Sequence, residues 1–134
     1  MPINNSNFVD KQRRRPVFLN LFVLRLPVSG VVSILHRITG VLLVLLVPVV
    51  LYVFDLSLSD PGYFQSLKTW MSQWWGNILL LLILLMLIQH FLSGLRHLAL
   101  DVDLGIDKQT AKITAWLTFV GTLVLLAAFQ WWMR

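Results

Sequence analysis

The chain has 134 residues, of which 57% are hydrophobic and 13% charged, and its mean hydropathy is +0.77. This balance lies far on the apolar side of soluble domains and indicates an integral membrane protein. We attribute the net charge of +5 to membrane topology rather than to nucleic-acid binding. The chain has no cysteine, so it supplies no thiolate ligands for an iron–sulfur cluster and no disulfide.

Three apolar stretches reach the roughly 20 residues that a membrane-spanning helix requires. We therefore expect an all-α fold with a cytoplasmic N-terminal arm over residues 1–30 and a three-helix transmembrane domain over residues 31–134. Pro16 and Pro27 argue against one long helix in the arm, where residues 17–26 should lie along the membrane interface. The expected spans are about 31–57, 76–100 and 110–133.

The residues between the spans carry turn signals. Pro48 falls inside the first span and should kink it, while residues 59–62 (Ser-Asp-Pro-Gly) predict a turn in the first connection. A short amphipathic segment could follow over residues 63–71. In the second connection, Gln109 or Thr110 could open the third helix.

The distribution of Lys and Arg predicts the orientation in the membrane. Nine cations fall on the N-terminal side and in the second connection, against two on the other face, Lys68 and Arg134. Cytoplasmic segments carry the excess of cations, and tryptophans favour the membrane interface. Paired tryptophans begin the second span and end the third, at the predicted outer interface. We expect a multi-pass protein of the bacterial inner membrane, with a cytoplasmic N-terminus and a periplasmic C-terminus.

Two histidines lie in the second apolar stretch. His90 and His97 are seven residues apart on one helical face, with Gly94 between them. An imidazole in hydrocarbon is costly without a partner, which makes both residues functional candidates. The helical rise separates them by roughly 10 Å along the axis, whereas two axial ligands of one iron lie on the order of 4 Å apart. They cannot ligate the same metal.

His90 is a candidate axial ligand of a b-type haem, provided that another helix fills the opposite position. Gly94, one turn away, would leave room for a flat macrocycle against the backbone. The alternative is a histidine that is hydrogen-bonded to a neighbouring helix, and this alternative applies to His97 as well.

A second polar cluster lies in the first span. Ser33, His36 and Arg37 project onto one side of the helix, because they are three or four residues apart. Ser33 and Arg37 could donate to a carbonyl oxygen, and His36 and Arg37 could meet carboxylates such as haem propionates. An antiparallel pairing of the first two spans would bring the two clusters together. Arg37 could instead reach lipid phosphate, and the spacing of Thr114, Thr118 and Thr122 in the third span indicates helix packing.

Two motifs resemble those of a known family. Residues 33–40 (Ser-Ile-Leu-His-Arg-Ile-Thr-Gly), preceded by Arg15-Pro16, and residues 90–97 (His-Phe-Leu-Ser-Gly-Leu-Arg-His), followed by Asp101, are similar to the cytochrome b membrane-anchor subunits of succinate dehydrogenase. Their order, their spacing and the three-span topology agree, and the resemblance runs from about residue 15 to the C-terminus.

The resemblance implies a subunit of succinate:quinone oxidoreductase that is not catalytic alone. It implies partners: a flavoprotein with FAD, an iron–sulfur protein and a second small membrane subunit that supplies the other axial histidine of a shared haem b. His90 would ligate the iron, Ser33 and Arg37 would line the ubiquinone site, and His36 and Arg37 would approach the haem propionates, with His97 a less certain neighbour.

The sequence departs from the family pattern after Asp101, where an aromatic residue and a glycine usually follow closely. Residues 102–105 are Val-Asp-Leu-Gly instead, so no functional residue is carried over onto this loop. Two other functions remain open from the residues themselves. One is a purely structural anchor without haem, and the other is a small proton-conducting or transport subunit with its histidines as a relay.

Overall fold

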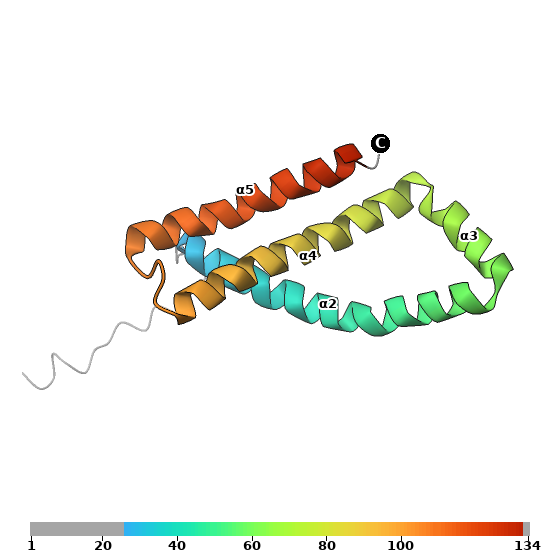
Figure 1. The fold of residues 1–134 in the computed structure, drawn as a ribbon, viewed down its shortest axis with the longest axis horizontal. Coiled ribbons are helices and arrows are strands. Elements are labelled where there is room, and N and C mark those ends of the chain that lie inside the picture. The colour runs from blue at the N-terminus through green and yellow to red at the C-terminus, as the bar shows by residue number, and fades with distance from the viewer. Residues whose placement is uncertain (1–25, 133–134) are drawn as a thin grey trace, which may run out of the picture.

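A computed structural model of the chain describes residues 26–132, which are almost entirely helical (Figure 1). The four helices are α2 (Val28–Ser59), α3 (Pro61–Met71), α4 (Trp74–Asp101) and α5 (Lys108–Trp132). Three of them, α2, α4 and α5, are long and apolar enough to cross a membrane. The predicted all-α, three-span integral membrane fold is confirmed. The N-terminal arm up to residue 25 lies outside the described residues, with all five of its cations and all but the last residue of its expected interfacial segment, as do residues 133–134.

Helix α4 lies between α2 and α5, and Figure 1 shows that α2 and α4 pack at one end and separate toward α3. We call the end where α2 begins, α4 ends and α5 begins the α4–α5 end. Pro48 lies within α2 and does not terminate it. The expected short amphipathic segment, residues 63–71, makes up all of α3 except its first two residues, and α3 bridges α2 and α4 at the opposite end.

Short polar side chains set the helix ends. Asp60 ends α2 and also caps α3, because its carboxylate accepts a hydrogen bond from the backbone N–H of Gly62 at 2.8 Å and Pro61 takes the first helical position. Asp107 accepts from the N–H of Thr110 at 2.9 Å. Helix α5 therefore begins at Lys108, slightly earlier than Gln109 or Thr110, because the capping oxygen comes from the aspartate.

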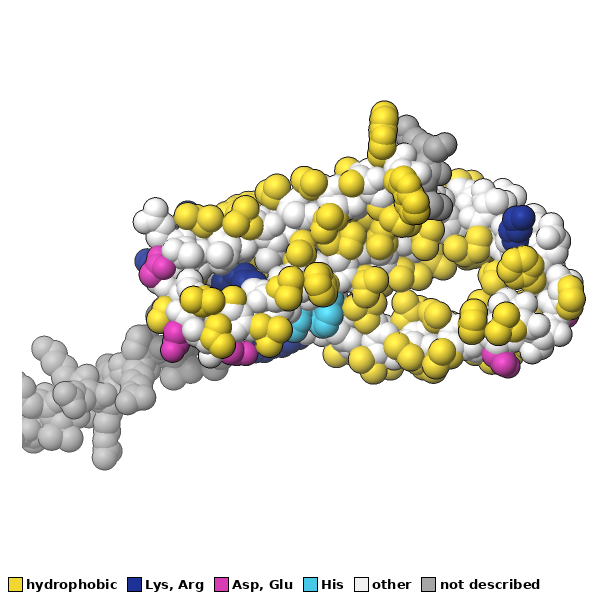
Figure 2. Space-filling model, in the orientation of Figure 1, with side chains coloured by type: hydrophobic (Ala, Val, Ile, Leu, Met, Phe, Trp, Pro, Cys, Tyr) yellow, Lys and Arg dark blue, Asp and Glu magenta, His cyan; other side chains and the backbone are white. Residues whose placement is uncertain are grey.

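The interior of the bundle is polar and its surface is apolar. Among the described residues only Val32 and Ala115 are buried hydrophobic residues, while the buried polar side chains are Thr39, Gln89, Ser93, Arg96, Thr118 and Thr122. Figure 2 shows hydrophobic side chains spread over the visible face of all the long helices. Small and polar residues between helices with apolar residues outside are typical of helices that pack in lipid. The chain is a multi-pass membrane protein.

Candidate functional site: an imidazole cluster between α2 and α4

Three histidines from two helices meet inside the bundle. The rings of His36 on α2 and His90 on α4 are stacked, with centroids 4.3 Å apart and planes inclined by 8°. His97, two turns further along α4, lies 5.1 Å from His36 at an angle of 48°. In Figure 2 the histidines form a compact polar patch between α2 and α4. The antiparallel pairing of the first two spans thus brings together the histidines of both motifs.

Two glycines let the rings approach the facing backbone. A Cβ atom on Gly40 of α2 would lie 3.0 Å from Cε1 of His90, and a Cβ on Gly94 of α4 would lie 3.3 Å from Nε2 of His36. Each helix therefore offers a glycine to the histidine of the other. The space above Gly94, which the sequence suggested for a macrocycle, is used by the His36 imidazole in this structure.

The hydrogen bonds of His90 define its tautomer. Its Nδ1 lies 3.1 Å from the backbone carbonyl oxygen of His36, a group that can only accept. The hydroxyl of Thr39, 3.3 Å from the same nitrogen, lies 2.8 Å from the carbonyl oxygen of Leu35, to which it donates. In the neutral ring, which is the form that ligates a metal, Nδ1 therefore carries the hydrogen and Nε2 has the lone pair. A backbone carbonyl behind Nδ1 is the usual partner of a metal-ligating histidine, because it orients the ring and raises its basicity.

The remaining predicted site residues lie on α2 near the cluster but outside its hydrogen bonds. Ser33 is partly buried, and Arg37, next to His36, is exposed. Within residues 26–132 the cluster's hydrogen bonds join His90 to His36 and Thr39, and neither Ser33 nor Arg37 takes part in them. Exposed donors on one side of α2 can serve a ligand only if another surface closes over them.

A buried series of hydrogen bonds lies on the α5 side of α4 and was not predicted from the sequence. Gln89 donates through Nε2 to Ser93 Oγ at 3.0 Å and accepts through Oε1 from the hydroxyl of Thr122 at 2.8 Å. A glutamine directly before His90 in an apolar run was the available signal, because an uncharged amide in lipid needs a partner on a neighbouring helix. Thr122, expected to serve helix packing, is that partner.

A three-span helical bundle with apolar sides and an imidazole cluster between two spans defines a small polytopic membrane protein that could hold a buried prosthetic group. Residues 11–129 match the family model described as "Succinate dehydrogenase/Fumarate reductase transmembrane subunit". The chain belongs to this family. It is therefore a membrane-anchor subunit and a part of an enzyme complex.

Individual relatives agree with this assignment over most of their length. The succinate dehydrogenase cytochrome b556 subunit of Paracoccus denitrificans is 32% identical over 111 residues, which cover 83% of this chain and 85% of that protein. The subunit of the same name from Rickettsia felis is 30% identical over 84% of this chain and 87% of its own length. That of Coxiella burnetii is 27% identical over 89% and 96%.

Proposed function

We propose that this chain is the haem-binding anchor subunit of a succinate:quinone oxidoreductase, and that it binds haem b and forms part of the ubiquinone-reduction site. The observation that carries the haem proposal is the environment of His90, whose Nδ1 faces a backbone carbonyl at 3.1 Å and whose Nε2 therefore keeps its lone pair. The names of the relatives, cytochrome b subunits, support the same reading.

The histidine cluster also supports a second membrane chain as the source of the other axial ligand. A nitrogen lone pair lies in the plane of its imidazole, and the rings of His36 and His90 are stacked within 8° of parallel. Their lone pairs therefore cannot point at one iron from opposite sides. Within residues 26–132, no three His, Asp or Glu side chains are grouped so as to hold a metal ion. This geometry supports our proposal that a histidine of a second small membrane subunit is the other axial ligand.

Haem bound here would supply a one-electron redox centre inside the membrane, and the chain would supply its placement and electrostatics. His90 would hold the iron through Nε2, with its ring kept in orientation by the His36 carbonyl. His36 and Arg37 would donate to the propionates, and His97, whose ring centroid lies 5.1 Å from that of His36, would lie on the same side of the site. A guanidinium is well suited to carboxylates because of its planar pair of donors.

Ser33 and Arg37 would act on ubiquinone at the α4–α5 end. They are one turn apart on α2, so that a hydroxyl and a guanidinium can donate to one carbonyl oxygen of the quinone. These donors orient the ring and stabilise negative charge on that oxygen as the quinone takes up two electrons and two protons to become the quinol. Because Arg37 is exposed, the iron–sulfur and second anchor subunits must close the site.

The partners and orientation follow the same proposal. A flavoprotein with FAD oxidises succinate, an iron–sulfur subunit relays the electrons, and neither cofactor belongs to this chain. The α4–α5 end carries Arg96, Lys108 and Lys112, while Lys68 on α3 is at the opposite end with Trp74 and Trp75. This bias supports a cytoplasmic α4–α5 end in a bacterial inner membrane, with the N-terminus inside and the C-terminus in the periplasm.

Substitution of His90 tests the haem site. His90→Ala should abolish Soret absorbance of the purified complex, whereas Trp116→Ala, an exposed aromatic on α5, should leave it unchanged. Co-purification of the flavoprotein subunit reports assembly separately from pigment. A fully assembled, active complex that shows the same Soret band with His90→Ala would refute the assignment and favour a purely structural anchor.

The quinone site has its own test. Ser33→Ala and Arg37→Ala should each lower succinate:ubiquinone reductase activity, because each removes a donor to the quinone oxygen. Succinate oxidation by an artificial acceptor should persist, since it does not use this chain. Unchanged quinone reduction in both variants would show that the donors of α2 do not bind ubiquinone.

A further inference from the structure

A buried cation lies between α4 and α5, apart from the histidines. Arg96 is only 8% exposed, and its guanidinium donates from Nε to the hydroxyl of Thr114 at 3.2 Å and from Nη2 to the carbonyl oxygen of Ala111 at 3.2 Å. Both acceptors are neutral, and a guanidinium has five N–H donors, so these bonds leave three N–H groups for a ligand. A buried charge is stable only when it is paired with an opposite charge.

The carboxylates at this end of the described chain do not neutralise Arg96. Asp101, Asp103 and Asp107 are all exposed, and Asp107 is engaged by the backbone N–H of Thr110. None of the three forms a hydrogen bond with the guanidinium within residues 26–132. The site therefore has a positive charge that an anion from outside this part of the chain can complete.

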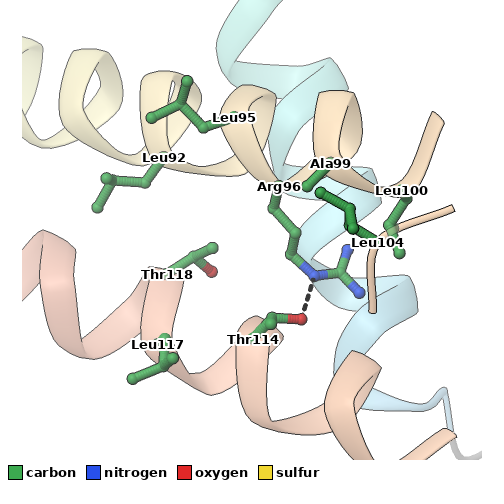
Figure 3. A pocket seen from close by; sticks show the side chains of 9 residues that line it. All are labelled: Leu92, Leu95, Arg96, Ala99, Leu100, Leu104, Thr114, Leu117 and Thr118. Carbon is green, nitrogen blue, oxygen red and sulfur yellow. Dashed lines mark hydrogen bonds between the residues drawn. The ribbon is translucent and has the colours of Figure 1, made fainter. Parts of the chain in front are cut away.

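A cavity of about 300 Å³ lies beside Arg96, with an apolar lining. Figure 3 shows the guanidinium reaching from α4 toward Thr114 on α5, with leucines of both helices around it. Leu95, Leu104 and Leu117 line this cavity and are 49%, 65% and 60% exposed, so it opens on the outer surface of the bundle. Its walls suit a hydrocarbon chain, and its polar end suits an anion.

The cavity lies on the side of α4 that faces away from the imidazole cluster. A helix turns by about 100° per residue, so Leu95 and Ala99 lie about 140° and 180° around the axis from His90. Both residues line the cavity. It is therefore separate from the haem and quinone sites proposed above and opens on the outer surface of this chain.

The depth of Arg96 matches that of lipid headgroups. Arg96 is five residues from the end of α4, and Ala111 is three residues from the start of α5. At about 1.5 Å per residue these positions lie roughly 8 Å and 5 Å from the helix ends. Helix α4 has 28 residues and spans roughly 42 Å, close to the thickness of a bilayer with its headgroups. The guanidinium thus lies at the boundary between headgroups and hydrocarbon.

We propose that the α4–α5 cavity is a binding site for one anionic phospholipid of the leaflet at this end, with its phosphate on Arg96 and one acyl chain against the leucines. A phosphate accepts two parallel hydrogen bonds from a guanidinium and neutralises it, which a neutral quinone does not. The exposed Lys108 and Lys112 at the start of α5 add positive potential that attracts anionic lipid.

The test uses the assembled complex in nanodiscs of phosphatidylcholine with a small fraction of phosphatidylglycerol. Phospholipid that stays bound after detergent extraction is identified and counted by mass spectrometry. Arg96→Gln should weaken retention of phosphatidylglycerol at least about tenfold, because a hydrogen bond to a charged group is lost. Lys68→Gln removes an exposed cation from α3 at the opposite end of the bundle and should leave retention unchanged.

A second variant separates binding from folding. Leu117→Trp fills the cavity without changing Arg96 and should also displace the lipid, while Val124→Trp, another exposed position on α5, should not. Equal retention of phosphatidylglycerol in wild type, Arg96→Gln and Leu117→Trp would overturn the proposal. So would equal retention of phosphatidylcholine, or full displacement of the lipid by inorganic phosphate, which would indicate a site for a free anion.

Discussion

The contact between Thr122 and Gln89 should account for a measurable part of the packing of α4 against α5. Thr122 and Thr118 are both on α5, 3% and 6% exposed, and each hydroxyl bonds to the backbone of its own helix. Only the Thr122 hydroxyl also faces another helix, and it shares its single hydrogen between the Thr118 carbonyl oxygen at 2.7 Å and Gln89 Oε1 at 2.8 Å. Replacing either threonine by valine keeps the shape and removes the hydroxyl, so the two variants differ by one interhelical hydrogen bond.

The expected loss of stability depends on the buried acceptor that the substitution leaves without a donor. Interhelical hydrogen bonds in membrane proteins contribute about 0.6 kcal/mol on average and up to about 1.7 kcal/mol, and a buried acceptor left without a donor costs about 1–3 kcal/mol. Gln89 is only 6% exposed, so water replaces the lost donor poorly. We therefore expect Thr122→Val to destabilise the chain by about 1–2 kcal/mol and Thr118→Val by less than about 0.5 kcal/mol.

The chain has no cysteine, so a single cysteine in place of the exposed Ser66 on α3 can carry a fluorophore that reports the unfolding of this chain alone within the complex. Titration with sodium dodecyl sulfate in mixed micelles gives the free energy of unfolding. The double variant with Gln89→Leu should recover part of the loss, because it removes the unsatisfied Oε1 but also takes the Nε2 donor away from the buried Ser93 Oγ. Equal effects of the two threonine variants, or no recovery, would refute the reasoning.

Three further predictions concern the glycines and a helix cap. Gly76→Ala should destabilise the α3–α4 turn by about 1–3 kcal/mol, measured by the same titration, since its Cβ would lie 2.6 Å from the backbone of Met71, which cannot move aside. Gly40→Ala, with a Cβ 3.0 Å from His90, should shift the Soret band by moving the imidazole, whereas Gly30→Ala, whose nearest contact is 3.8 Å, should not. The Thr110 N–H lowers the pKa of Asp107 below its ordinary value. The cap therefore stabilises α5 fully above that ordinary pKa and is lost as the pH falls through the lowered one. The protection factor of the Thr110 amide, which compares its exchange rate with that of an unstructured peptide at the same pH, should therefore fall there, and Asp107→Asn should abolish this fall.

Each of these predictions can fail in a specific way. A Gly76→Ala variant as stable as wild type would mean that the turn relaxes at no cost. Identical Soret bands for the Gly40→Ala and Gly30→Ala variants would show that displacement of the His90 imidazole does not affect the haem, and would contradict the assignment of His90 as its ligand. A Thr110 protection factor that does not change with pH in the wild type would show that the Asp107 carboxylate does not cap the start of α5.

The sequence alone was sufficient to predict the membrane class, the three spans and the family. These properties depend on local composition and on motifs of fewer than ten residues, because a span needs only a run of apolar side chains and a bilayer imposes helix on it. The motifs at residues 33–40 and 90–97 also indicated which histidines would matter. Their roles toward haem and quinone remain predictions.

The tertiary structure decided how the polar side chains are paired. The tautomer of His90 depends on a carbonyl 54 residues away in sequence, and the partner of Gln89 is 33 residues away. Periodicity places a residue on a helix face, but the rotation and register of one helix against the next depend on which small and polar residues fit together. The cavity beside Arg96 could not be predicted from the sequence either, because it is formed by residues of both α4 and α5.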